Sequence, residues 1–90
     1  MSMSVENEII FLGNEFDDEL RRVLVAVLER NGAVLVDEFW GVGGSQEVER
    51  MLFRIGSDVI TIEAETYVGL TICGPKLVVA DIAQQVRVWH

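Results

Sequence analysis

The sequence predicts an α+β fold, a two-layer sandwich with both helices on one face of a four-stranded antiparallel meander. Three observations favour it. Apolar residues recur at helical spacing in one segment near each end of the chain. Between these segments, β-branched and aromatic residues alternate with polar ones, as in half-buried strands. Glycines and the single proline divide the chain into elements of ordinary length, in the order helix, four strands, helix.

The chain of 90 residues is expected to form one domain over 1–90. Two domains would each be too small to hold a core without disulfides or metals. Half of the residues are hydrophobic, which excludes a disordered chain. Residues 1–13 are expected to be a lead-in segment or a short extra strand, because Ile9–Leu12 is too apolar to remain in solvent.

The first helix is expected over Glu15–Asn31. Asn14 is a good N-cap, and Asn31–Gly32 supplies a left-handed stop. Asp17 and Asp18 place negative charge near the positive end of the helix dipole. The expected buried stripe consists of Phe16, Leu20, Val23, Leu24, Val27 and Leu28.

The next segment, Ala33–Trp40, predicts a strand that ends in the glycine-rich loop Gly41–Ser45. Gln46–Ile55 fits either a strand or a helix. A hairpin turn at Gly56–Ser57 favours the strand, because its register pairs residues without conflict. The resulting pairs are Phe53 with Ile60, Met51 with Ile62, and Arg50 with Glu63.

Two further strands are expected at Asp58–Glu65 and Tyr67–Cys73. Their connection must hold an odd number of residues to keep the apolar residues of both strands on one face, and Ala64–Thr66 is the expected loop. The residues that would share this face are Ile60, Ile62, Val68 and Leu70.

The second helix is expected to begin at Pro75, whose missing N–H costs nothing at the first helical position. Its expected buried stripe is Val78, Val79, Ile82, Val86 and Trp89.

The face of the sheet away from the helices is expected to be unusually apolar for a solvated surface. The residues assigned to it are Trp40, Val48, Leu52, Val59, Tyr67 and Thr71. Contiguous exposed apolar area usually marks an interface, so this face or a strand edge is expected to form a homodimer.

The chain carries 15 acidic residues against 7 Lys and Arg, a formal net charge of -8. This balance argues against binding to nucleic acid or to an anionic membrane surface, since both require basic residues. No apolar stretch is long enough to span a bilayer, and Met1–Glu8 does not resemble a secretory signal. One cysteine, Cys73, cannot form an internal disulfide, so we expect a cytoplasmic protein.

Catalytic, metal and cofactor motifs are not recognisable in the sequence. A nucleophilic pair of Cys73 and His90 is formally available, but His90 is the last residue and a chain end is poorly held. The metal-ligand spacings of zinc and calcium sites are missing. Catalysis by carboxylates such as Asp37, Glu38, Glu63 and Glu65 remains the enzyme alternative. We expect no enzyme activity, no metal and no cofactor.

Acidic residues gather around the glycine-rich loop and the strand end that faces it. The expected partner-binding residues are Asp37, Glu38, Trp40, Glu47, Glu49, Glu63 and Glu65. A focused negative field accelerates encounter with a basic protein. The leading hypothesis is a small acidic protein-binding module, such as an immunity or inhibitor protein that blocks a basic nuclease toxin. The alternative is a small-ligand or effector-binding domain with a pocket between sheet and helices near Phe39, Trp40 and Trp89.

Overall fold

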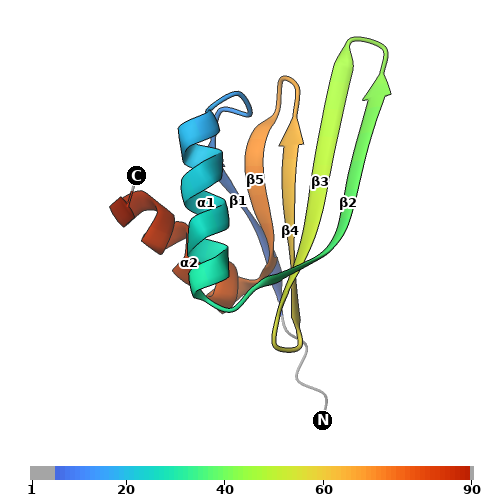
Figure 1. Cartoon of the computed structure of the whole chain (residues 1–90). Helices are drawn as coiled ribbons and strands as arrows, with labels where there is room; N and C mark the ends of the chain where they lie inside the picture. Colours follow the sequence, from blue (N-terminus) through green and yellow to red (C-terminus); the bar gives the residue numbers. More distant parts are fainter. Residues whose placement is uncertain (1–5, 90) are drawn as a thin grey trace.

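The computed structural model describes residues 6–89, which form a five-stranded antiparallel sheet with two helices on one face (Figure 1). The predicted two-layer α+β fold is confirmed. The elements are β1 (Asn7–Gly13), α1 (Asp18–Arg30), β2 (Val34–Gly43), β3 (Gln46–Ile55), β4 (Asp58–Glu65), β5 (Gly69–Pro75) and α2 (Lys76–Trp89).

The strand order is β1-β5-β4-β3-β2, so the sheet has β1 at one edge and β2 at the other. The meander of four strands is extended by β1, which pairs antiparallel with β5. Of the two expectations for residues 1–13, the extra strand is therefore confirmed for Asn7–Gly13. Residues 1–5 lie outside the described residues.

The first helix begins at Asp18, three residues later than expected. Its N-cap is Asp17, whose Oδ1 accepts the Leu20 N–H at 3.0 Å. The prediction of Asn14 as N-cap is wrong, because the Asn14 Oδ1 accepts the Phe16 N–H at 2.7 Å and closes the turn before the helix. Phe16 consequently precedes the helix and is 72% exposed, which contradicts its expected place in the buried stripe. The rest of that stripe is buried, and the helix stops before Gly32, at φ +81°.

Gln46–Ile55 is a strand, and the hairpin at Gly56–Ser57 has the predicted register. Arg50 Nε donates to Glu63 Oε2 at 2.9 Å across that register. The expected five-residue loop at Gly41–Ser45 is wrong. Gly41 and Gly43 continue β2, because they pair with β3, and only Gly44 and Ser45 form the turn.

The connection between β4 and β5 has the expected three residues, but it lies at 66–68 instead of 64–66. The cause is the length of β4, whose last residues still pair with β3, and the Thr66 N–H donates to the Glu47 carbonyl at 2.9 Å. Tyr67 in the turn and Gly69 at the start of β5 take positive φ angles. Val68 is thus exposed, not buried as expected, whereas the pairing of Ile62 with Ile72 preserves the shared face.

The second helix begins at Lys76, and Pro75 ends β5 opposite Asn7 instead of opening the helix. Val79, Ile82 and Val86 are buried as predicted, and Val78 is partly buried. Trp89 is not part of the core. Its ring is half-exposed, with the Arg30 guanidinium 5.2 Å above its centroid.

The core lies between the helices and the sheet and is built from α1, α2, β4, β5 and the Phe53 side of β3. Both helices lie toward the β1–β5 side, and the β2–β3 hairpin projects beyond them (Figure 1). Every residue of β2 except Gly41 is exposed. The hairpin thus presents a sheet surface that the protein's own helices do not cover.

The other side of the sheet, which we call the open face, carries the predicted residues Val48, Leu52, Val59 and Thr71. Two residues assigned to it by sequence lie elsewhere. Trp40 pairs with Glu49 and therefore points to the helix side, and Tyr67 lies in the turn after β4. The exposed apolar side chains of the open face include Ile9, Phe11, Phe39 and Val59.

Candidate functional site

The structure divides the seven predicted partner-binding residues between the two faces of the sheet. Four lie on the helix side: Glu38, Trp40, Glu47 and Glu49. Three lie on the open face: Asp37, Glu63 and Glu65. Adjacent strand residues point to opposite faces, so Asp37 and Glu38 cannot act on one surface. The sequence predicted that all seven gather near the Gly41–Ser45 segment, but Asp37 and Glu38 pair with Leu52 and Met51, farther along the ladder from the turn, and the seven are divided by face.

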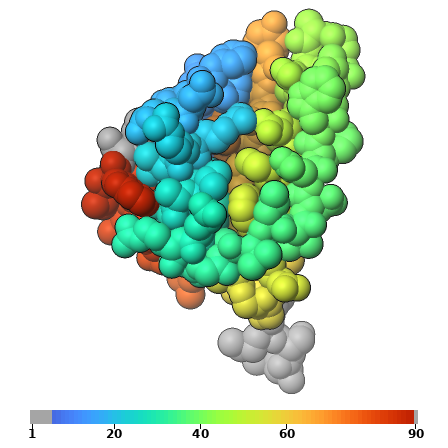
Figure 2. Space-filling model, in the orientation of Figure 1, coloured from blue at the N-terminus to red at the C-terminus, as the bar shows by residue number. Residues whose placement is uncertain are grey.

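Three of the four helix-side residues, Trp40, Glu47 and Glu49, line a groove between the start of α1 and the β2–β3 hairpin. Figure 2 shows this hollow between the helix in cyan and the strand in green, with yellow atoms at its base. Its volume is about 300 Å³. We call it the acidic groove, and its lining residues are Glu15, Phe16, Asp18, Arg21, Trp40, Glu47, Glu49, Ala64 and Thr66.

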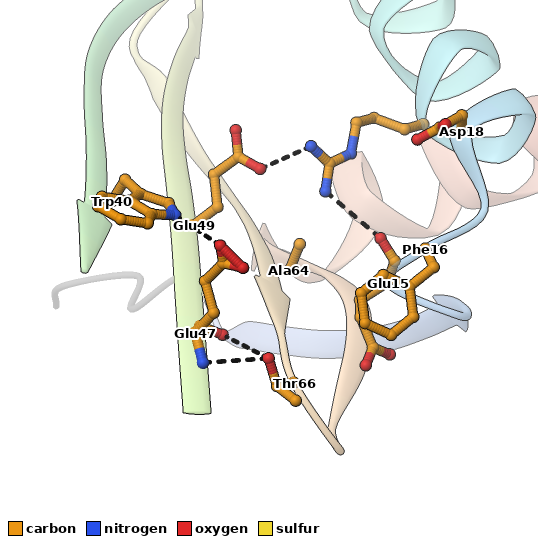
Figure 3. Close-up of a pocket in the computed structure, with 9 residues that line it drawn as sticks. Glu15, Phe16, Asp18, Trp40, Glu47, Glu49, Ala64 and Thr66 are labelled. Atoms are coloured by element: carbon orange, nitrogen blue, oxygen red, sulfur yellow. Dashed lines mark hydrogen bonds and ion pairs between the residues drawn. The ribbon is translucent and has the colours of Figure 1, made fainter. Parts of the chain in front are cut away.

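An ion pair joins α1 to β3 inside the groove. Arg21 Nη1 lies 2.6 Å from Glu49 Oε1, and Arg21 Nη2 donates to the Glu15 carbonyl at 3.4 Å (Figure 3). Both side chains of the ion pair are about one-third exposed. Arg21 Nε is buried and has no hydrogen-bond partner among the described residues. The guanidinium thus compensates Glu49 and fixes the helix against the hairpin.

On the hairpin side, the groove is bounded by the Trp40 indole of β2, which is hydrogen-bonded to the Glu47 carboxylate of β3. Trp40 Nε1 donates to Glu47 Oε2 at 2.9 Å (Figure 3). The Glu47 N–H in turn donates to Thr66 Oγ1 at 3.0 Å. These bonds orient Trp40 although it is 62% exposed. An exposed but oriented aromatic side chain is typical of binding surfaces.

The opposite wall comes from residues that the sequence did not assign to a site. Glu15 and Phe16, in the turn before α1, and Asp18, the first residue of α1, line this side of the groove (Figure 3). Glu15 Oε2 also accepts the Tyr67 N–H at 3.2 Å, which ties the β4–β5 turn to this wall. The sequence did contain a signal for this wall, because four of the five residues in the segment 15–19 are acidic. Compensation of a helix dipole needs fewer charges, so the excess could have indicated a binding surface.

The groove holds a concentrated negative charge. Its lining contains four carboxylates and one guanidinium, an excess of three negative charges. Glu38 adds a further exposed carboxylate on the same face of β2. On the open face, by contrast, Arg50 pairs with Glu63 and its guanidinium lies 5.9 Å from the Phe39 ring centroid.

The aromatic residues proposed for a ligand pocket do not come together. Phe39 and Trp40 are neighbours on opposite faces of β2, and only Trp40 lines the acidic groove. Trp89 lies on α2 beside Arg30, at a separate open hollow of about 460 Å³. A pocket shared by all three residues is therefore not formed.

The other groups considered for chemistry are the single thiol, the single histidine and clusters of metal ligands. Cys73 is a free, half-buried thiol on the open face, close to Glu63 and Thr71. His90 lies outside the described residues, so its pairing with Cys73 stays a prediction. Within residues 6–89, no three His, Cys, Asp or Glu side chains are grouped to hold a metal ion. Over the same range, neither helix has the length and apolarity required to cross a membrane.

Comparison with protein-family models, with curated proteins and with solved structures gave no match.

Proposed function

We propose that this protein is a non-enzymatic binding module that recognises a basic protein partner through the acidic groove. The observation that carries the proposal is the groove's lining, where four carboxylates and an exposed indole surround one guanidinium (Figure 3). Such a lining attracts Lys and Arg side chains by charge and packs their aliphatic stems against the aromatic ring.

Electrostatic attraction supports both fast encounter and specificity in this proposal. The groove's excess of three negative charges belongs to a chain of formal net charge -8, so near and distant charges act in the same direction. Long-range attraction raises the association rate, and the local arrangement of carboxylates selects among basic surfaces.

Exposed apolar side chains around the groove favour a protein partner over a small ion. Phe16, Trp40 and Val42 are each more than half exposed. Apolar anchors beside charged groups form the usual centre of a protein interface. The most specific form of the proposal is an inhibitor or immunity protein for a nuclease toxin, whose nucleic-acid-binding surface is basic.

We further propose that two copies of the chain associate through the open face. Ile9, Phe11, Phe39 and Val59 are each more than half exposed there, and apolar surface of this kind usually marks an interface. Light scattering at micromolar concentration should give twice the chain mass of 10.1 kDa. A single species at the chain mass would contradict this part of the proposal.

The main proposal is tested by capture of partners from cell extract on the immobilised protein, followed by calorimetry with each captured protein. The groove variant combines Asp18→Asn and Glu47→Gln. The matched control combines Glu6→Gln and Glu29→Gln, two exposed acids outside the groove. We expect basic proteins to bind the native and control proteins, and to be lost with the groove variant or in high salt. Equal affinity of the groove variant and the control for the captured partner would overturn the proposal.

A further inference from the structure

The free edge of β2 is the longest unpartnered stretch of backbone in the described sheet. β2 has ten residues and pairs only with β3, as the last strand in the order β1-β5-β4-β3-β2. Natural edge strands are commonly protected by Lys, by Pro, by short length or by a covering segment. β2 contains neither Lys nor Pro, and a bulge at Val36 interrupts only its first part.

The hydrogen bonds of β3 identify which β2 residues have free backbone groups. The Glu47 carbonyl accepts the Thr66 N–H, so the backbone of Glu47 is directed to β4. Its neighbours in β3 are then directed to β2, where they bond Gly43 and Gly41. The alternate residues of β2, Glu38, Trp40 and Val42, therefore direct their N–H and C=O groups away from the sheet. The Glu38 N–H already donates to Asp37 Oδ1 at 2.8 Å, so the groups open to a new strand are those of Trp40 and Val42 and the Glu38 carbonyl.

These three residues are also the ones whose side chains lie on the helix side, next to the acidic groove. In an antiparallel pair, residues directly opposite each other point to the same face. An added strand that bonds Trp40, Val42 and the Glu38 carbonyl would thus place alternate side chains on the helix side. From there, Glu47 is two strand spacings away, roughly 10 Å, which a Lys or Arg side chain and the glutamate span together.

A second copy of the chain is a poor occupant of this edge. A twofold pairing centred on Asp37 or Glu38 sets an acidic side chain opposite itself, which is destabilising. Pairings centred on Phe39 or Trp40 set the Glu38 carboxylate against Trp40 or Val42 and bring two acidic grooves close together. A strand with basic side chains has neither disadvantage.

We infer that β2 binds an extended segment of the basic partner as a sixth strand of the sheet, with alternating Lys or Arg side chains directed over Trp40 toward the acidic groove. This inference rests on the proposed function and adds the mode of binding. Backbone bonds to the edge supply affinity, and the charges on one face of the added strand supply selectivity.

The test uses a nine-residue peptide of alternating Lys and Val, with acetylated and amidated ends, and two N-methylated forms of it. N-methylation of the Lys residues blocks the N–H groups that would bond β2, whereas N-methylation of the Val residues blocks only the outer edge. Both forms keep the same charge. We expect the Lys-methylated peptide to bind at least tenfold more weakly than the parent, and the Val-methylated peptide to bind within twofold of it, by calorimetry.

A protein variant tests the same bond from the other side. Val42→Pro removes an outward N–H without breaking the β2–β3 ladder, and the preceding Gly41 tolerates a following proline. We expect Val42→Pro to bind the parent peptide at least tenfold more weakly than the native protein does. The control variant, Val42→Thr, should bind it with unchanged affinity.

The possible outcomes separate the two proposals. Equal binding of all three peptides, with weaker binding to Glu47→Lys, would overturn strand addition and leave the acidic groove as the site. Lack of binding by the parent peptide at millimolar concentration would overturn both. A dimer of the free protein that Val42→Pro dissociates would show that a second copy occupies the edge, which also overturns the inference.

Discussion

Charge reversal at Glu47 should weaken the binding of a basic ligand, whereas the same change at Glu29 should not. Glu47 lines the acidic groove, and Glu29 is exposed near the end of α1. Each substitution by Lys changes the net charge by the same amount, so overall charge is matched between the two variants; Glu47→Lys also removes the acceptor of the Trp40 indole N–H. The comparison isolates the groove from the overall acidity of the chain.

The expected magnitude follows from the two distances. A ligand ammonium about 4 Å from Glu47 gains about 1 kcal/mol in water, so reversal costs about 2 kcal/mol. Screening at 0.15 M ionic strength, with a Debye length of about 8 Å, reduces this to about 1.2 kcal/mol, or about eightfold in Kd. Glu29 lies eleven positions after Asp18, about 16 Å along the helix, where the screened effect is about 0.1 kcal/mol.

Calorimetry of the alternating Lys–Val peptide against the native protein and both variants measures this difference. Urea unfolding of the same proteins checks that the exposed substitutions leave the fold intact. The reasoning would be refuted by Kd values for Glu47→Lys and Glu29→Lys that agree within twofold, because overall charge alone would then explain binding.

Three further predictions concern the fold. Phe53→Ala should lower the free energy of unfolding by about 3–5 kcal/mol in urea, because the ring is 4% exposed in the core; a loss below about 1 kcal/mol would contradict this. Asp17→Ala should lower the free energy of unfolding by about 1 kcal/mol, because it removes the N-cap, and Asn14→Ala should lower it less. A larger loss for Asn14→Ala than for Asp17→Ala would show that Asn14 is the N-cap, as the sequence predicted. A double-mutant cycle on Arg50 and Glu63 should give a coupling below about 1 kcal/mol, since the pair is partly exposed, and a value above about 2 kcal/mol would show that solvent does not screen it.

The sheet register was predictable because it depends on local chemistry. A two-residue turn at Gly56–Ser57 fixes every pair between β3 and β4, and the period of two then assigns each side chain to a face. The same register favoured a strand over a helix for Gln46–Ile55, and the structure has a strand there. The N-cap was less predictable, because Asn14 and Asp17 are both good caps; Asn14 closes the preceding turn by accepting the Phe16 N–H, and Asp17 accepts the Leu20 N–H as the cap.

The acidic groove could be predicted only in part. Its hairpin wall was identified through Trp40, Glu47 and Glu49, but its helix wall at Glu15 and Phe16 was not. The two walls are about thirty residues apart in sequence and meet because α1 packs beside β3. Periodicity within one element carries no information on that contact. The prediction for Phe16 failed for this reason. Helical spacing assigned it to the core, but the helix begins after it and its side chain is exposed.

The central claim is that a basic ligand binds at the acidic groove and at the adjacent edge of β2. The two tryptophans provide the most direct test, because Trp40 donates its indole N–H to Glu47 in the groove whereas Trp89 lies on α2 beside Arg30. Their indole N–H signals in a nitrogen–proton correlation spectrum are followed while the alternating Lys–Val peptide is added. We expect the Trp40 signal to shift with the peptide and the Trp89 signal to stay in place. A shift of Trp89 with an unmoved Trp40 would contradict the central claim.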